Sequence, residues 1–254
     1  MEFARNAGGM LMHQRKYTLE LISDLGLGGS KPSVTPVELH LKLTTHEFDL
    51  HVGSSGADSL LADPSEYQQL VGRLLYLTII RPDISFAVQH LSQFMHAPKA
   101  SHMKAAVRVV KYVKQAPGLG LYMAVQIADT LQAYCDADWG SCINTRKSIT
   151  GYMIQFGSAL LSWKSKKQPT ISRSSAEAEY RSLASTIAEV VQAGLVMIQY
   201  LPTQEQPADI LTKGLSSAQH AYLVSKLGLK NIFIPPSLKG GIEDYDYDKQ
   251  VAAS

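Results

Sequence analysis

The chain has 254 residues, of which 45% are hydrophobic and 18% are charged, so it can bury a core of ordinary globular size. It has no apolar run long enough for a membrane span and no leader of the secretory type, and we expect an intracellular protein with no membrane contact. The two cysteines, Cys135 and Cys142, lack the paired spacing of a zinc ribbon or a disulfide framework. We expect both to be reduced thiols.

The charge is distributed unevenly along the chain. The formal net charge is +2, but the segment from Lys99 to Arg173 has 11 Lys/Arg against three Asp, a local +8, which leaves −6 for the rest. A basic middle in a near-neutral chain is typical of contact with nucleic-acid phosphates, although a solvated surface has the same pattern. Charge alone leaves both interpretations open.

The N-terminal half is predicted to be mainly helical. Residues 9–14 form a short apolar stretch, and Tyr17 to Leu25 follow a helical pattern that ends at Gly26. Residues 28–62 are rich in glycine, proline and serine and are predicted to be a connecting loop.

Three consecutive amphipathic segments follow this loop. The first opens at Asp63 with capping signals and stops at Pro82, and the others cover residues 83–95 and 101–115. The last carries Lys104, Arg108 and Lys111 at helical spacing. These three cations form either a solvated face or a ridge that faces nucleic acid.

The pattern changes to that of short strands after residue 118. Strands are predicted at 120–125, 131–139, 147–157 and 159–165, followed by a helix at 174–193, a buried strand at 195–202 and a short helix at 207–213. This order indicates a mixed α/β domain. The polar, acidic tail from Lys239 is predicted to be disordered.

Acidic residues in the predicted strand at 131–139 need an explanation. Alternation places Asp136 and Asp138 on the same face as Tyr134. Two acids on a buried face are costly unless they are paired or bind a cation, whereas on a solvated face they need no partner. Asp209, in the last short helix, is similarly either functional or a first-turn acid favoured by the helix dipole.

The segment SSAEAEY contains two glutamates that helical spacing separates. Glu177 falls on the same side as Arg181 and is predicted to be a surface acid paired with it. Glu179 falls with Leu183 and Thr186 on the stripe predicted to face the sheet. Glu179 is therefore the better candidate for chemistry.

Three acids near a basic segment suit divalent-cation chemistry on a phosphodiester, because Mg²⁺ prefers hard oxygen ligands. The absence of histidine between His102 and His220 excludes a Ser-His-Asp arrangement around Ser174 or Ser175, and a histidine-rich zinc site.

Several motifs together resemble the C-terminal part of copia-type retrotransposon Pol polyproteins. They are YQQLVGRLLYLTIIRPDISFAVQHLSQF, AYCDADW, RKSITGYMI, SWKSKKQPTISRSSAEAEYRSLA and YLPTQEQPADILTKGL, and the resemblance runs to about Pro236. It implies the end of a reverse transcriptase followed by a ribonuclease H domain. The implied division is a palm end and linker (1–62), a helical thumb or connection region (63–125), a ribonuclease H-like domain (126–216) and a partly disordered tail (217–254).

The resemblance also implies a site. Asp136, Glu179 and Asp209 match the family's Mg²⁺-binding catalytic acids, and the implied substrate is an RNA–DNA hybrid. The basic residues expected to bind nucleic acid are Lys104, Arg108, Lys111, Lys164, Lys166, Lys167 and Arg173.

Two departures from the family pattern limit what this chain is expected to do. The chain has no Asp-Asp dipeptide, so the reverse transcriptase active site is absent. A family block with a strand, a helix and a fourth carboxylate is missing between TIAEVV and MIQYLPT. We expect an α/β ribonuclease H-like mixed sheet that lacks one strand and one helix. Residues 195–201 could fill the gap and give four strands with Asp209 near Asp136; a frustrated, partly folded domain is the alternative.

Three functions stay open at this point. The chain could be a Pol fragment whose ribonuclease H-like domain has lost most of its catalysis, a residual Mg²⁺-dependent ribonuclease H, or a non-catalytic nucleic-acid binder.

Overall fold

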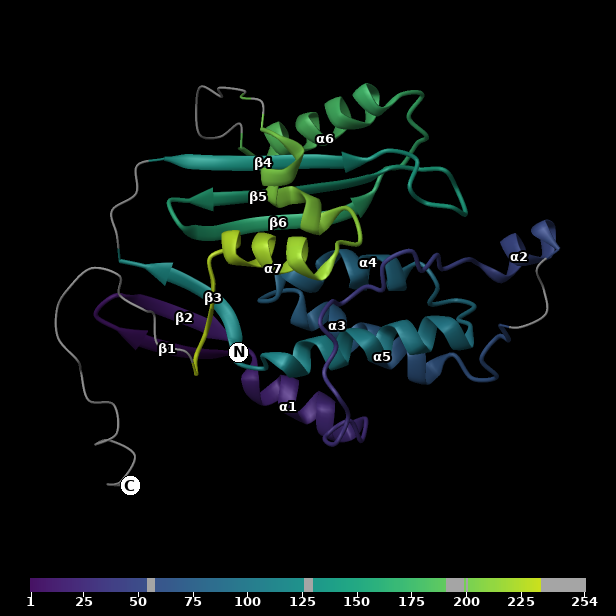
Figure 1. Cartoon of the computed structure of the whole chain (residues 1–254), viewed down its shortest axis with the longest axis horizontal. Helices are drawn as coiled ribbons and strands as arrows, with labels where there is room; N and C mark the ends of the chain where they lie inside the picture. Colours follow the sequence, from purple (N-terminus) through teal and green to yellow (C-terminus); the bar gives the residue numbers. More distant parts are fainter. Residues whose placement is uncertain (54–57, 126–129, 191–198, 200, 234–254) are drawn as a thin grey trace.

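The computed structural model describes residues 1–53, 58–125, 130–190, 199 and 201–233, and Figure 1 shows their arrangement. The fold is mixed α/β: a four-stranded and a three-stranded antiparallel sheet contact each other, and helices pack beside them. In the part of the chain that the structure describes, no helix is long and apolar enough to span a bilayer.

The four-stranded sheet joins the two ends of the chain. Its order is β1 (Glu2–Asn6), β2 (Gly9–His13), β3 (Leu119–Ala124) and β7 (Leu229–Asn231). Sequence reasoning gave β2 only as an apolar stretch, and it missed β1 and β7. All three strands are short, and although β1 and β2 form a local hairpin, β2 and β7 pair with β3 from distant parts of the chain, so local periodicity carries little signal for them.

The helical layer follows the sequence prediction closely. It consists of α1 (Arg15–Asp24), α3 (Ser65–Leu77), the 3₁₀ turn η1 (Pro82–Ile84), α4 (Ser85–Ser92) and α5 (Ala100–Gln115). The apolar residues of α3 at i, i+3 and i+4 spacing are all buried, as expected of an amphipathic helix: Tyr67, Leu70, Val71, Leu74 and Leu77. One contiguous core cluster unites these helices.

The loop predicted at 28–62 contains a helix, α2 (His46–Val52), that the sequence analysis missed. A buried cation holds it against α5. The Lys99 ammonium lies 2.5 Å from Asp49 Oδ2 and 3.1 Å from Asp58 Oδ2, and its side chain is 2% exposed. This pairing is a tertiary feature, so the glycine-rich and proline-rich composition of the segment gave no sign of it.

The three-stranded sheet contains the predicted acidic strand. Its order is β4 (Leu131–Asp138), β5 (Ile149–Phe156) and β6 (Ala159–Lys167). Helix α6 (Ser175–Val190) contacts β4 and β5. The 3₁₀ turns η3 (Thr203–Glu205) and η4 (Pro207–Leu211) and helix α7 (Ser217–Lys226) follow, and η4 contacts the sheet on the face away from α6 (Figure 1).

The C-terminal region contains ordered elements beyond the three-stranded sheet. Residues 217–231, expected to be tail, instead form α7 and β7, because the buried Leu223 and Leu227 pack into the core cluster around Met153. The predicted strand at 195–201 lies mostly outside the described residues, and Gln199 and Leu201, which are described, are not in a strand. The four-stranded version of this sheet is therefore not formed among the described residues, where β4 pairs only with β5. The tail from Lys239 also lies outside them.

Candidate carboxylate site on the three-stranded sheet

Strand β4 positions the first candidate acid at the edge of the sheet. Asp136 pairs in register with Gly151 of β5. Strand alternation puts Asp136 and Asp138 on one face, as predicted, and the hydrogen bond from Thr212 shows that this face is toward η4. The Asp136 side chain is 13% exposed, so this acid is largely withdrawn from water.

The turn η4 brings Asp209 to the same place. Gln206 precedes the turn, where its side chain accepts a hydrogen bond from the Ala208 N–H and donates one to the Cys135 carbonyl at 3.0 Å. This double contact fastens the start of η4 to the outer edge of β4. The Asp209 side chain is 6% exposed, and its buried Oδ1 has no hydrogen-bond partner within the described part of the chain.

Gly151 makes this close approach of η4 possible. A Cβ at position 151 would lie 2.7 Å from Thr212 Cγ2, 2.8 Å from Leu211 Cβ and 3.1 Å from the Ala208 carbonyl oxygen. Side chains of other residues would need more space than the turn leaves. The glycine opposite Asp136 is therefore what lets Asp209 reach that aspartate.

Replacing Gly151 with valine is expected to destabilise the protein by about 1–3 kcal/mol through overpacking, although valine itself favours strands. The displaced turn should carry Asp209 away from Asp136 and lower the pKa of Asp209 toward its ordinary value. Urea unfolding and an NMR titration of the Asp209 carboxyl group measure the two effects.

Gly72 in α3 is the matched control, since a Cβ there would meet no atom within 4 Å. Gly72→Ala should stabilise the protein by up to about 1 kcal/mol through helix propensity and leave Asp209 unaffected. An unchanged pKa of Asp209 in Gly151→Val would contradict the positioning role of Gly151.

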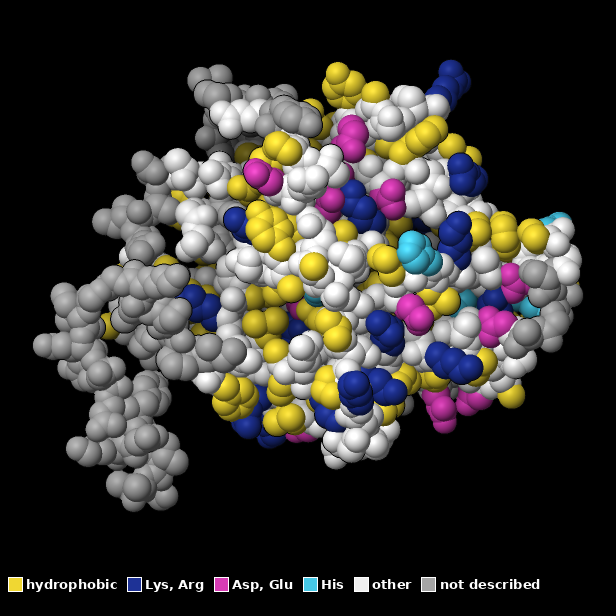
Figure 2. All heavy atoms as spheres, in the orientation of Figure 1, with side chains coloured by type: hydrophobic (Ala, Val, Ile, Leu, Met, Phe, Trp, Pro, Cys, Tyr) yellow, Lys and Arg dark blue, Asp and Glu magenta, His cyan; other side chains and the backbone are white. Residues whose placement is uncertain are grey.

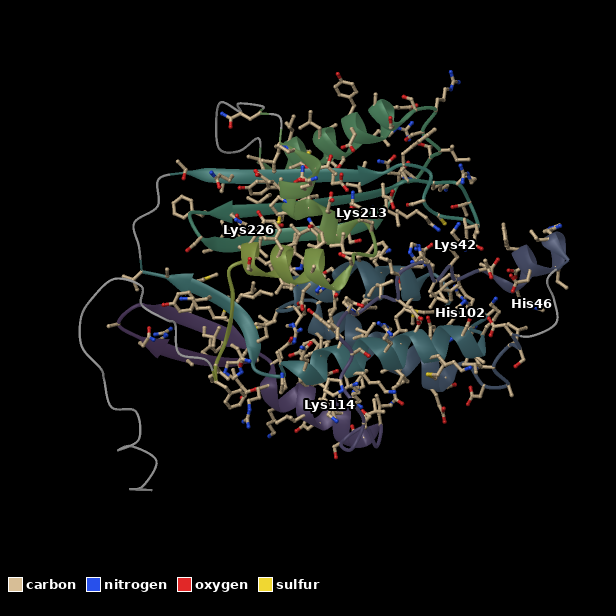
Figure 3. The ribbon with its side chains drawn as sticks, in the orientation of Figure 1. Lys42, His46, His102, Lys114, Lys213 and Lys226 are labelled. Carbon is tan, nitrogen blue, oxygen red and sulfur yellow. The ribbon has the colours of Figure 1, made fainter. Side chains whose placement is uncertain are left out.

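Lys213 and Thr212 complete the site from the residues just after η4. The Lys213 ammonium lies 3.0 Å from Asp209 Oδ2 and 3.6 Å from Asp136 Oδ2, and Thr212 Oγ1 donates a hydrogen bond to Asp136 Oδ2. Figure 3 labels Lys213 beside the sheet, and Figure 2 shows Lys/Arg and Asp/Glu side chains adjacent at the middle of the same face. We call Asp136, Asp209 and Lys213 the carboxylate site.

The electrostatics of the carboxylate site reflect two acids that share one lysine. Burial, followed by the negative charge of Asp136, raises the pKa of Asp209 to about 6, against the opposing effect of Lys213. Burial alone would lower the pKa of Lys213, but the charges and hydrogen bonds of the two aspartates outweigh it and raise that pKa. Asp209 is therefore close to gaining a proton near neutral pH.

Glu179 lies beside this site rather than within it. Partial burial and the charge of Asp136 raise the pKa of Glu179, and interaction with the Ala137 backbone N–H opposes the rise. The buried stripe of α6 is Ala178, Ser182 and Thr186, so the predicted stripe is right for Thr186, while Glu179 lies one position away from the buried residues. Glu179 is exposed at the margin of the helix.

The neighbouring prediction for α6 is confirmed. Arg181 Nη2 lies 2.7 Å from Glu177 Oε1, and Glu177 also accepts a hydrogen bond from the Arg173 backbone N–H at 2.7 Å. Glu177 thus caps and braces the start of the helix on the solvent side. It has no contact with the carboxylate site.

The structure thus brings Asp136 and Asp209 together around Lys213, with Glu179 close enough to respond to both charges. Among the described residues, no group of three His, Cys, Asp or Glu side chains forms a ready metal-binding cluster. Sequence reasoning missed Lys213 and Thr212. The signal for Lys213 was its i+4 spacing from Asp209, which suits an acid–base pair on one face of a turn.

The seven basic residues expected to bind nucleic acid do not form one surface. Arg108 donates to Thr35 Oγ1 at 3.2 Å and pairs with Glu38 at 3.9 Å, so it anchors the 33–38 loop, while Lys104 is exposed. Lys167 donates to Gln93 of α4 at 2.7 Å. The remaining four are half-buried Lys111 on α5, exposed Arg173 before α6, and Lys164 and Lys166 on the opposite face of β6 from Lys167.

Comparison with known proteins identifies the family of this chain. The retrovirus-related Pol polyprotein from transposon RE2 of Arabidopsis thaliana is 33% identical over 94% of this chain, and that from transposon RE1 of the same plant is 32% identical over 93%. The uncharacterized mitochondrial protein AtMg00810 of Arabidopsis thaliana is 38% identical, covering 75% of each chain. This chain belongs to the copia-type retrotransposon Pol family.

The extent of the match to the Pol relatives is informative. The chain spans about a fifth of the RE1 and RE2 polyproteins, 19% of each. The alignment with RE2 covers 293 positions, more than the 254 residues of this Pol-related chain, so the relative has positions without a counterpart here. No family model matches the chain, and no solved structure matches it.

Proposed function

We propose that residues 126–216 of this copia-type Pol chain form a shortened ribonuclease H-like domain that retains a Mg²⁺ site and has lost most of its hybrid-cleaving activity. The observation that carries the proposal is the convergence of Asp136 and Asp209 from two distant segments. Their sequence motifs are those that resemble the family's catalytic acids.

The element order supports the domain assignment. Three consecutive antiparallel strands are followed by a helix against the first two and by an acidic turn that returns to the first strand. The relatives' additional aligned positions are consistent with a block missing from this chain. We place that block between α6 and Leu201, where the family pattern has a further strand and the fourth carboxylate.

The residues of the carboxylate site suit one hydrated Mg²⁺ ion. Mg²⁺ keeps several waters and is commonly held by one or two carboxylates, which Asp136 and Asp209 supply. The buried Asp209 Oδ1 has no partner among the described residues, as expected of an atom available to a cation. A bound Mg²⁺ ion would supply Lewis-acid stabilisation of charge on a scissile phosphodiester.

The protein's own residues have separate roles in this proposal. Thr212 orients Asp136 by donating to its Oδ2, and Gln206 fixes η4 on β4 so that Asp209 stays in range. Lys213 balances the two carboxylates and must give up these contacts when an ion is held. With three acids instead of four, we expect cleavage weaker by at least on the order of 10²-fold, as when one electrostatic stabiliser is lost.

The test combines Mg²⁺ binding with cleavage of an RNA–DNA hybrid by the purified chain. We expect calorimetry to detect weak Mg²⁺ binding, and slow cleavage, with both lost in Asp136→Asn. Asp24→Asn removes an equal charge from exposed Asp24 far from the site and should change neither result. Absence of Mg²⁺ binding in the unaltered chain would overturn the proposal, and cleavage undiminished in Asp136→Asn would identify a contaminant.

A non-catalytic nucleic-acid binder is the second candidate function. It is favoured by Lys164, Lys166 and Arg173, which stay exposed on or near one side of the three-stranded sheet. Binding through phosphate contacts should weaken steeply as salt rises, and insensitivity to salt would count against it.

A further inference from the structure

A groove lies between helix α6 and strand β6, on the sheet face that α6 packs against, where the helix covers β4 and β5. Its volume is about 390 Å³, within the usual range of roughly 300–1,000 Å³ for small-ligand sites. Its lining includes Thr150, Lys164, Lys166, Gln168, Thr170 and Arg181. No acidic side chain contributes to this lining.

The groove is separate from the carboxylate site. In the strand register, Lys166 pairs with Thr150, and Asp136 pairs with Gly151. Because neighbouring residues of a strand point to opposite faces, Lys166 and Thr150 lie on the face opposite to Asp136. The groove therefore belongs to the α6 face of the sheet and the carboxylate site to the η4 face.

The cations of the groove are available to an anion. Lys166 is exposed and has no ion-pair or hydrogen-bond partner within the described ranges. Lys164 pairs with Glu189 at 3.8 Å between side chains that are both nearly half exposed, an interaction that contributes little and exchanges easily. Its ammonium also lies 6.0 Å from the centre of the Tyr152 ring. Glu177 and Thr170 hold Arg181 in place, so its guanidinium has a fixed position in the lining of the groove.

The floor of the groove is rigid and presents a hydroxyl. The buried Gln168 side chain donates to Thr150 Oγ1 and to the Ala178 carbonyl, each at 3.0 Å, and accepts from Ser172 at 2.9 Å. Thr150 is 8% exposed, and its own hydroxyl hydrogen has no acceptor among the described residues. A fixed donor below two lysines and an arginine matches the oxygens of a phosphate group.

We propose that this groove is a phosphate-binding site, with Lys164 and Lys166 as its charged ligands and Thr150 as a buried donor. The phosphate can come from a nucleic-acid backbone, in which case the site adds a contact to the proposed function, or from a free oligophosphate. Either source uses the same side chains. The site requires neither Mg²⁺ nor cleavage.

The experiment measures binding of inorganic tripolyphosphate and of a fluorescent RNA–DNA hybrid to the full chain in the presence of EDTA. The double variant Lys164→Gln/Lys166→Gln is expected to bind tripolyphosphate about tenfold or more weakly, because charge-assisted hydrogen bonds are lost. The matched control is Lys31→Gln/Lys42→Gln, which removes the same charge from two exposed lysines outside the groove. It should bind as the unaltered chain does.

The outcomes separate the two sources of phosphate and the failure of the proposal. If tripolyphosphate displaces the hybrid and both ligands are lost in the groove variant, the strand backbone occupies the site. If the groove variant loses only tripolyphosphate, the ligand is a free oligophosphate. Equal losses in the groove and control variants, or none in either, overturn the proposal. Because the assay contains EDTA, its result does not depend on Mg²⁺ at the carboxylate site, and failure of that site is seen separately in the Mg²⁺ calorimetry.

Discussion

Replacing Asp83 with asparagine is expected to lower the free energy of unfolding by about 3–5 kcal/mol, because it leaves the Arg81 charge buried without its counter-charge. Arg81 Nε and Nη2 lie 2.9 and 2.7 Å from the two Asp83 carboxylate oxygens, and the two side chains are 3% and 0% exposed. Tyr112 OH also donates to Asp83, at 2.7 Å. Urea unfolding followed by circular dichroism measures the loss.

The position of this pair makes the effect global. Arg81 also donates to the Ala116 carbonyl at the end of α5, and Tyr112 of α5 packs edge-on against His220 of α7. The pair therefore joins the helical layer to the elements that cover the three-stranded sheet. Loss of the pair should loosen the contact between α5 and α7 as well as the turn η1.

An exposed ion pair provides the control for charge removal. Arg73 lies 2.8 Å from Asp24, whose side chain is 60% exposed, so Asp24→Asn should cost no more than about 1 kcal/mol. A double variant, Arg81→Met/Asp83→Asn, should recover part of the stability lost in Asp83→Asn, since no unpaired charge remains. Similar small losses in Asp83→Asn and Asp24→Asn would contradict the proposed role of the buried pair.

The sequence predicts the elements whose residues interact locally. The face of α3 and the acidic strand β4 have strong periods of 3.6 and 2 residues, and both form as expected. Strand β3 pairs with β2, more than 100 residues earlier, and a Cβ on Gly120 would lie 2.1 Å from the Met12 carbonyl oxygen. Such a contact is visible only after both strands are placed.

The candidate site was also predictable only in part. The motifs single out Asp136 and Asp209, and the structure places both beside Lys213. The route differs from the one predicted: the Gln206 side chain and the missing Cβ of Gly151 hold η4 on β4, with no added strand among the described residues. Glu179 lies one position away from the buried residues of α6 because sequence alone does not fix which stripe of the helix faces the sheet. A shift of one residue turns a helix position by about 100°.

His102 gives the second large expected effect, on stability as a function of pH. Its ring is buried and stacked on Phe94 at 3.9 Å between centroids, and its Nδ1 accepts the Lys99 N–H at 3.0 Å. Burial, followed by the Lys99 charge, lowers the pKa of His102 to about 4, while the Thr44 carbonyl and Asp58 oppose the shift. The neutral ring is thus part of the folded state.

The direction of the pH effect follows from proton counting. Between the ordinary pKa of 6.5 and about 4, the unfolded chain protonates His102 and the folded chain does not. Stability should therefore fall as pH falls through this window, by on the order of 3 kcal/mol for this group. His90, whose pKa burial also lowers to about 4, acts in the same direction. Asp209, whose pKa is raised to about 6, opposes both because its folded form gains the proton first.

Variants separate the His102 contribution from the others. His102→Asn keeps an acceptor for the Lys99 N–H at the start of α5 but cannot titrate, so the loss of stability between pH 6.5 and 4 should become smaller by about the His102 contribution. Leu74→Ala, in the core cluster that contains Phe94, is the control for lost packing, since it should lower stability by a similar amount at every pH. Urea unfolding midpoints across this pH range provide the measurement. A pH dependence that is the same in His102→Asn and in the unaltered chain would show that the pKa of His102 does not differ between the folded and unfolded states. The assignment of a neutral, stacked ring below pH 6.5 would then be wrong.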